Sequence, residues 1–227
     1  MKATLLGAVV SDGLENGQVI SGVGGQYDFV RQSFAVDGAC SLIMLNALRD
    51  GTPQAESNVV WSYGHITMPR HLRDIVITEY GAAYLRGAND ADVIKRMISV
   101  ADAQFQDDLI KTAQENGKLS KGFNKPDFWS ENTSRHIEQN LAPFREKGLL
   151  PEYPFGTDFT AVEQKLIKAL DKLKPISKSK SKLIRMTWKG FRKKPNKDQL
   201  AAIKRMGLDK PQNLDERIKA YLLRAVL

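Results

Sequence analysis

The chain has 227 residues, of which 42% are hydrophobic, and its formal net charge at pH 7 is +8. This length and apolar content indicate a soluble globular chain, with one large domain or a domain and an extension. Its apolar runs are much shorter than the roughly 18 to 20 residues that span a bilayer, which excludes membrane insertion but not association with a membrane surface.

The N-terminal apolar run ATLLGAVV, residues 3–10, mimics a secretory signal. Asp12 follows at once without a small-residue cleavage motif, so we interpret the run as a β-strand. The single cysteine, Cys40, has no second cysteine with which to form an internal disulfide, and this predicts a reducing, cytoplasmic setting. Because Cys40 adjoins the apolar segment SLIML, we expect it to be packed in a strand and not to act as a nucleophile.

Four further short apolar runs are rich in β-branched residues and are bounded by Gly, Pro, Asn and Asp. They lie at residues 19–20, 40–45, 59–61 and 75–77 and are typical of buried strands. The segment YDFVRQSFAV, residues 27–36, is long enough for a short helix between the first two. This order favours an α/β fold, a sheet flanked by helices, over an all-β sandwich.

After Gly87 the apolar spacing becomes helical. A first helix is predicted to begin at Asn89-Asp90, and a second, residues 105–117, to end at Gly117, where a left-handed residue is favoured. A third helix is predicted at residues 133–147. The apolar repeat of the first comprises Val93, Ile94, Met97, Ile98 and Ala101.

The C-terminal part has its own helical signals. Thr160 and Glu163 form a capping-box pair that opens an amphipathic helix. The segment KPISKSKSKLIR, residues 174–185, is predicted to be a linker, because Pro175 should stop the helix and alternating Ser and Lys offer nothing to bury. Two small helices are predicted beyond it. We therefore expect a domain over residues 1–160 and a basic helical extension over residues 161–227.

The stretch SGVGGQYDFVRQ, residues 21–32, places glycines between an apolar run and a helix. It fits neither common phosphate-loop formula, since Gly-Lys-Ser/Thr is absent and Tyr27 stands where the dinucleotide fingerprint requires glycine. Such glycines either form a purely structural turn or expose backbone N–H groups that hold an anion or a developing oxyanion. The glycines are Gly22, Gly24 and Gly25.

Three separated motifs carry a family resemblance. They are SGVGGQYDFVRQ, VVWSYGHITMPRHLRDIVITEYGAAYLRG (residues 59–87) and DADVIKRMISVADAQFQDDLI (residues 90–110). Together they resemble the C-terminal region of the acetyl-CoA hydrolase/acyl-CoA transferase family, which is related to acetate and 4-hydroxybutyrate CoA-transferases. The resemblance covers about residues 1–160, and it implies a CoA-transferase-like α/β domain.

The resemblance also implies a reaction. In this family a glutamate attacks the acyl-CoA thioester, gives an anhydride, and is captured by the CoA thiolate as glutamyl-CoA; transfer to a carboxylic acid or to water completes the cycle. By the resemblance, Gly24 and Gly25 supply backbone donors near the thioester, and Gly22 and Gly25 contact CoA. Arg49 in NALRDG would help to bind CoA, and Gln26 would line the site. CoA is then the acyl carrier, and no metal is implied.

Two departures from the family pattern matter. Transferase relatives often continue the motif as Gly-Gly-Gln-x-Asp-Phe-x-x-Gly-Ala-x-x-Ser, whereas this chain has Gln32, Ser33 and Val36 at the last three defined positions, which leaves hydrolysis and transfer as alternatives. The nucleophilic glutamate of the family lies well upstream of the glycines, and Glu15 is too close to be its counterpart. We therefore expect an inactive C-terminal portion of a longer enzyme, with its N-terminal half as a partner and a homodimer as a further expectation.

Glu79 and the three histidines are further candidate site residues. Glu79 in VITEYG either lines the site or pairs with an arginine, such as Arg70, Arg73 or Arg86. The three histidines are not spaced as zinc ligands and have no cysteine beside them, so no metal site is expected.

The positive charge belongs to the C-terminal extension. Residues 161–227 contain 19 Lys and Arg against 6 Asp and Glu, or +13, whereas residues 1–160 contain 15 against 20, or −5. With Trp188, Phe191 and Tyr221 interleaved, the extension is also compatible with a non-enzymatic module that binds nucleic acid or an acidic surface. The scatter of lysines around each helix favours a solvated extension instead. A third alternative is attraction of the anionic nucleotide end of CoA.

Overall fold

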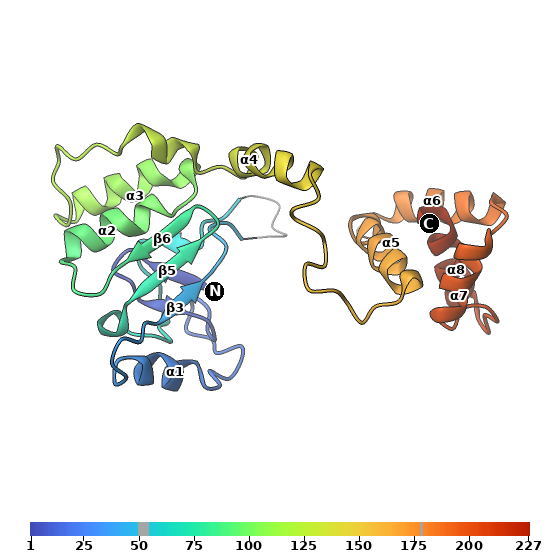
Figure 1. The fold of residues 1–227 in the computed structure, drawn as a ribbon, viewed down its shortest axis with the longest axis horizontal. Coiled ribbons are helices and arrows are strands. Elements are labelled where there is room, and N and C mark those ends of the chain that lie inside the picture. Colours follow the sequence, from blue (N-terminus) through green and yellow to red (C-terminus); the bar gives the residue numbers. More distant parts are fainter. Residues whose placement is uncertain (50–54, 178) are drawn as a thin grey trace. The chain divides into compact units, whose positions relative to one another are not determined.

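The computed structural model describes residues 1–49, 55–177 and 179–227. The chain forms two compact units, Met1–Leu150 (unit 1) and Pro151–Leu227 (unit 2), and each has its own apolar core (Figure 1). The division expected from the sequence, after residue 160, falls between this boundary and the first helix of unit 2. Within the described ranges, no helix combines the length and apolarity needed to cross a membrane.

The first sheet of unit 1 begins with a hairpin. Strand β1 (Lys2–Thr4) pairs antiparallel with β2 (Val9–Val10) and parallel with β4 (Val59–Val60). The single strand expected over residues 3–10 is therefore wrong. Gly7, with φ +84°, reverses the chain between β1 and β2, and its N–H donates to the Thr4 carbonyl at 2.8 Å.

The second sheet joins β3 (Leu42–Met44), β5 (Ile75–Thr78) and β6 (Gly81–Tyr84). Strand β5 is central, parallel to β3 and antiparallel to β6. This confirms the strand predicted at residues 75–77. Strand β3 confirms a strand within residues 40–45, but its expected burial is wrong, because Leu42 and Met44 are exposed and only Ile43 packs against the core. Two small mixed sheets flanked by helices confirm the α/β class.

Two expectations for the first 45 residues are corrected. Cys40 precedes β3 and is exposed, so the expected packing in an apolar strand is wrong. Residues 19–20 form no strand: Val19 makes one isolated bridge to Gly13, and both Val19 and Ile20 are exposed. The segment is held by the Asp12 carbonyl, which accepts a hydrogen bond from the N–H of Ile20 at 2.8 Å.

The helices of unit 1 lie close to their predicted positions. Helix α1 (Gln26–Ser33) follows the glycines directly. Helix α2 (Asp90–Ser99) begins at the Asn89 cap, and α3 (Ala103–Glu115) ends before Gly117, whose φ is +65°. The apolar stripe of α2 is fully buried against β6 and α3, which confirms the predicted core face. Helix α4 (Ser134–Glu146) and the short 3₁₀ turns η1 (Arg70–Leu72) and η2 (Asp127–Glu131) complete the unit.

The described secondary-structure elements of unit 2 are all helices. Thr160 and Glu163 make the predicted capping contacts: the Glu163 N–H donates to Thr160 Oγ1 at 3.3 Å, and the Thr160 N–H donates to Glu163 Oε2 at 2.8 Å. The core of the unit is centred on Leu166, Ile203 and Leu223, and the described residues contain four helices. They are α5 (Ala161–Ser177), α6 (Lys180–Arg192), α7 (Lys197–Arg205) and α8 (Leu214–Val226), of which α7 and α8 confirm the two predicted small helices.

The linker predicted at residues 174–185 is wrong. Helix α5 runs through Pro175 to Ser177, and α6 begins at Lys180; Lys178 lies outside the described residues. Pro175 has no N–H to donate to the Asp171 carbonyl, so the helix lacks that hydrogen bond, and α5 ends two residues later. The alternation of Ser and Lys concealed an apolar face of α6 that includes Ile184 and Trp188.

Candidate functional site

The glycine turn presents bare backbone to solvent. Gly24 has φ +62°, and Gly25 forms the N-cap of α1 with φ −87°. A Cβ added to Gly22 or Gly24 would meet no heavy atom within 4 Å, and one added to Gly25 would meet only the exposed ring of Phe29 at 3.1 Å. The turn is therefore open to the approach of another molecule, with no large side chain over Gly22 or Gly24.

The amide groups of this turn are the relevant donors. Among the described residues, no oxygen accepts a hydrogen bond from the N–H of Gly24 or Gly25. The Gly25 carbonyl instead accepts from the Phe29 N–H at 3.0 Å, in the first turn of α1. The two N–H groups thus stand at the N-terminal end of a helix, where backbone donors and the helix dipole favour a negatively charged group.

A cleft of about 410 Å³ lies beside the segment that leads into the turn. It is built where strand ends that are distant in sequence meet: the start of β1, the loop after β2, and the chain after β3. Ile20 is part of its wall, two residues before Gly22. Its other lining residues are Met1, Lys2, Val10, Ser11, Gly13, Leu14, Leu45, Asn46, Leu48, Arg49, Asn58 and Tyr63.

Two cations face this cleft. Arg49, expected from the sequence, lines it and makes an ion pair of 3.1 Å with Glu56, in which both side chains are about half exposed. Lys2, which the sequence did not single out, lines it too; its Nζ donates to the Ser57 carbonyl at 2.8 Å and lies 6.0 Å from the centre of the Tyr63 ring. Partial burial is the main cause that lowers the pKa of Lys2 below its usual value.

One hydrogen bond links the cleft to the glycine turn. The Oγ of Ser11, which lines the cleft, donates to Oε1 of Gln26 at 2.5 Å, and Gln26 follows Gly25 directly. The Ser11 N–H donates to Thr67 Oγ1 at 2.9 Å, which fixes the position of Ser11. The structure thus brings Gln26 and Arg49 to the same region, whereas Gly24 and Gly25 are exposed and are not among the residues that line the cleft.

A partly buried polar cluster supports the loop that carries Ser11. The carboxylate of Asp12 accepts hydrogen bonds from Thr67 Oγ1 and from His65 Nε2, the latter at 2.9 Å. The hydrogen bond from Thr67 is the largest cause that lowers the pKa of Asp12. Gly13 lies so close to His65 that an added Cβ would sit 2.4 Å from its ring. His65 therefore holds this loop in place.

Glu79 holds the chain segment that leads to Arg49 and does not itself line the cleft. It lies in the turn between β5 and β6, and its Oε2 accepts from the Ala47 N–H at 2.7 Å, within the segment that carries Arg49. The expected pairing of Glu79 with an arginine is wrong. Arg70 and Arg73 each contact Asp90 at 3.3 Å, and Arg86 contacts Asp74 at 2.6 Å.

Metal ligation has little support in the described part of the chain. Its His, Cys, Asp and Glu side chains form no group of three or more that could hold an ion. His136 lies 3.5 Å from Glu131, and His65 is engaged with Asp12. The polar groups at the cleft are amides, hydroxyls and cations, which suit an anionic organic ligand better than a metal ion.

Comparison with known proteins gives a consistent result. Residues 1–113 match the family model of the acetyl-CoA hydrolase/transferase C-terminal domain. A probable butyrate:acetyl-CoA coenzyme A-transferase of Syntrophomonas wolfei is 33% identical over 99 residues, which are 42% of this chain and 22% of the relative. A 4-hydroxybutyrate coenzyme A transferase of Clostridium kluyveri is 30% identical over 111 residues, 48% of this chain and 26% of the relative.

The chain thus spans about a quarter of the length of these curated relatives. Among solved structures, RipA from Yersinia pestis aligns with a TM-score of 0.44 and 28% identity, over 52% of this chain and 25% of that protein. The residues that the family model matches include the glycine turn, the residues that line the cleft, and the elements from β1 to α2. Residues 1–113 of the chain therefore belong to the acetyl-CoA hydrolase/transferase C-terminal domain family.

Proposed function

We propose that the chain is the CoA-binding C-terminal portion of an acyl-CoA hydrolase or CoA-transferase that acts on acetyl-CoA or a similar short acyl-CoA. One observation carries the proposal. The N–H groups of Gly24 and Gly25 have no acceptor among the described residues, and Gln26 ties their turn to a cleft that two cations face. This arrangement suits a ligand with a polarisable carbonyl and an anionic body.

In this proposal the thioester oxygen lies against the glycine amides. Attack on the thioester carbon moves negative charge onto that oxygen, and preorganised N–H donors stabilise the charge; one such donor typically contributes about 100- to 1,000-fold in rate. Lys2 and Arg49 would attract the phosphates of CoA toward the cleft through their positive potential. Asn46 and Ser11 add polar groups to its wall.

The covalent step needs a glutamate that we place outside this chain. A carboxylate oxygen attacks the thioester carbon and expels CoA thiolate, which then attacks the glutamyl carbonyl of the anhydride and releases the acyl carboxylate. Neither nearby glutamate is positioned for this: Glu15 accepts from the Gly64 N–H at 3.1 Å, and Glu79 accepts from Ala47. We propose that the N-terminal part of the enzyme supplies the nucleophile, in a cytoplasmic protein that forms a homodimer.

Isothermal titration with CoA tests the binding half of the proposal. Arg49→Ala should weaken CoA binding by about 10-fold, since it removes one charge-assisted contact. Arg135→Ala is the matched control, because Arg135 is an exposed arginine of α4 that lies outside the cleft. Equal affinities for wild type and Arg49→Ala, or the absence of CoA binding, would contradict the proposal.

A trapping experiment tests the chemical half. The chain is incubated with acetyl-CoA and treated with hydroxylamine or borohydride, and glutamate modification is sought by mass spectrometry. We expect CoA binding without a glutamyl adduct. An adduct on any glutamate of this chain would show that the nucleophile has been misplaced, although the CoA site itself would stand.

A further inference from the structure

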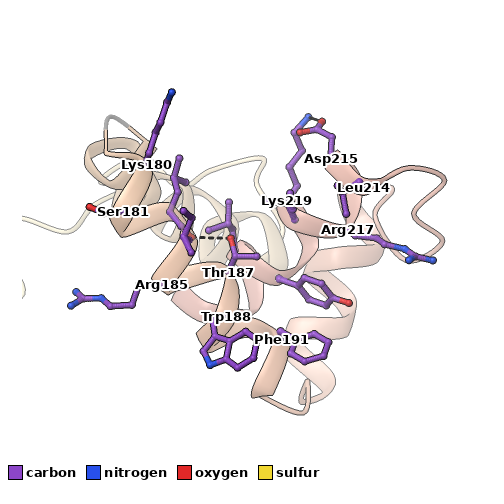
Figure 2. Close-up of a pocket in the computed structure, with 15 residues that line it drawn as sticks. Lys180, Ser181, Arg185, Thr187, Trp188, Phe191, Leu214, Asp215, Arg217 and Lys219 are labelled. Atoms are coloured by element: carbon purple, nitrogen blue, oxygen red, sulfur yellow. Dashed lines mark hydrogen bonds and ion pairs between the residues drawn. The ribbon is translucent and has the colours of Figure 1, made fainter.

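Helices α6 and α8 of unit 2 form a wide apolar groove of about 1140 Å³ (Figure 2). The two helices cross at Gly190, where an added Cβ would lie 1.8 Å from the Tyr221 carbonyl oxygen, so their backbones touch at this point. Close contact there leaves the side chains beside the crossing to form the walls of the groove. Phe191 packs edge-to-face on Tyr221 and lies 5.9 Å from Trp188 between ring centres.

The apolar side chains of the groove are unusually exposed. Ile184 is 71% exposed, Trp188 59%, Phe191 57% and Leu214 72%. Soluble proteins rarely expose such contiguous apolar patches unless they are interaction sites. A small molecule in an enclosed pocket would be surrounded by buried walls, whereas side chains this exposed need a broad apolar phase to cover them.

The margins of the groove are basic. Lys180, Arg185 and Arg217 line it, and in the described part of the chain none of the three has a carboxylate partner. Figure 2 shows their side chains extending outward, away from the aromatic rings. The lining carboxylate of Asp215 is paired with Lys219 at 2.5 Å. The groove therefore carries surplus positive charge around an apolar centre, the arrangement of side chains that place their charged ends at a polar boundary.

The positive charge extends well beyond the groove. Residues 172–197 contain eleven Lys and Arg and no Asp or Glu, and this segment includes the whole of α6. A single acidic peptide in the groove would meet only part of this charge. An extended anionic surface would meet the whole segment, so charge complementarity favours a surface as the occupant.

We propose that this face of unit 2 docks on the surface of an anionic lipid bilayer. An amphipathic helix with Lys and Arg on its polar face and Trp, Phe and Leu on the other lies in the membrane interface, with the apolar side chains among the acyl chains. Trp188 and Phe191 suit the interface itself. Ile184 and Leu214 favour a lipid over a nucleic acid as the occupant. Aliphatic side chains gain free energy on transfer from water to hydrocarbon, whereas contact with phosphates gives them little.

Vesicle binding by the whole chain tests the proposal. The probes are large unilamellar vesicles of phosphatidylcholine alone and of phosphatidylcholine with 30% phosphatidylglycerol, at about 0.1 M salt, where charges are screened beyond about 10 Å. We expect sedimentation with the anionic vesicles only, and a blue shift of the tryptophan fluorescence that Trp188→Phe abolishes. The interaction should weaken as salt rises.

Two variants separate charge from apolar insertion. Lys180→Glu/Arg185→Glu/Arg217→Glu should lower the partition coefficient by at least about 100-fold, from roughly 5-fold for each cation removed. Ile184→Ser/Leu214→Ser should reduce it while leaving the charge intact. The matched controls are Lys204→Glu and Leu200→Ser, exposed residues of α7 outside the groove, which should bind like wild type. Thermal melts establish that each variant is folded.

Three results would overturn the proposal. One is equal binding to neutral and anionic vesicles, or binding to neither. Another is a concentration-dependent dimer that Ile184→Ser/Leu214→Ser abolishes, because the groove would then face a second copy of the chain. The third is retention of a single-stranded oligonucleotide at 0.15 M salt that vesicles do not compete away, because the basic face would then serve nucleic acid. None of these results bears on CoA binding by unit 1.

Discussion

Ser11 Oγ donates a 2.5 Å hydrogen bond to Gln26 Oε1 and thereby joins the cleft to the glycine turn. We predict that Ser11→Ala lowers the free energy of unfolding by about 1 kcal/mol, as is typical for one lost hydrogen bond. It should also speed amide exchange at residues 24–26. Ser33→Ala is the matched control, since Ser33 Oγ donates to the Val30 carbonyl at the other end of α1. Exchange that rises equally in both variants would contradict the link.

Gly24 and Gly17 form a second matched pair. Both are exposed, both have positive φ (+62° and +80°), and an added Cβ meets nothing within 4 Å at either. Alanine at either position should therefore cost about 1 to 2 kcal/mol in backbone strain. Only Gly24→Ala should also weaken CoA binding, because its methyl group stands beside the amides proposed to hold the thioester. Urea unfolding and CoA titration measure the two effects separately.

The lowered pKa of Glu163 predicts that unit 2 loses stability at acid pH. The hydrogen bonds from Thr160 are the first causes that lower the pKa of Glu163 from 4.5 to about 2, with Arg205 contributing. A depressed folded-state pKa stabilises the fold above pH 4.5, and that contribution is lost as the pH falls from 4.5 to 2. Circular dichroism against pH should show this loss in wild type and in Asp209→Asn, and less of it in Glu163→Gln.

Gly190 makes the contact between α6 and α8 possible. Because a Cβ there would meet the Tyr221 backbone at 1.8 Å, Gly190→Ala should force the helices apart and lower the free energy of unfolding by at least about 2 kcal/mol. Gly122→Ala should be nearly neutral, since its Cβ meets only Ser120 Oγ at 3.8 Å. Urea denaturation followed by far-UV circular dichroism compares them. A neutral Gly190→Ala would contradict the observed helix crossing.

Local signals in the sequence were sufficient for most helices. The Asn89 cap, the Thr160–Glu163 pair and the glycine after α3 each act within one helical turn, so they can be recognised without knowing the tertiary structure. The predictions failed where a local sequence signal did not match the tertiary structure. Pro175 signalled a helix end that α5 overrides by two residues, and the Lys-rich start of α6 resembled a linker because its alternating Ser and Lys hide the apolar face that includes Ile184 and Trp188.

The sequence likewise predicted some residues of the candidate site and missed others. The glycine turn and Arg49 were predicted through motifs of the family. Lys2 and Ser11 were missed, because they reach the cleft only through pairing between distant segments, such as the parallel register of β1 with β4 and the contact of Lys2 with Ser57. A sequence reveals residue types in a motif, but not which distant strand end will lie beside it.

The central claim is that the amides of Gly24 and Gly25 bind the thioester region of an acyl-CoA. Their ¹⁵N–¹H NMR signals during titration with acetyl-CoA test it most directly. The account predicts that both signals move saturably, together with those of Gln26 and Arg49, while the Gly17 signal stays in place. If the glycine signals stay fixed while acetyl-CoA binds elsewhere on the chain, the proposed site is contradicted.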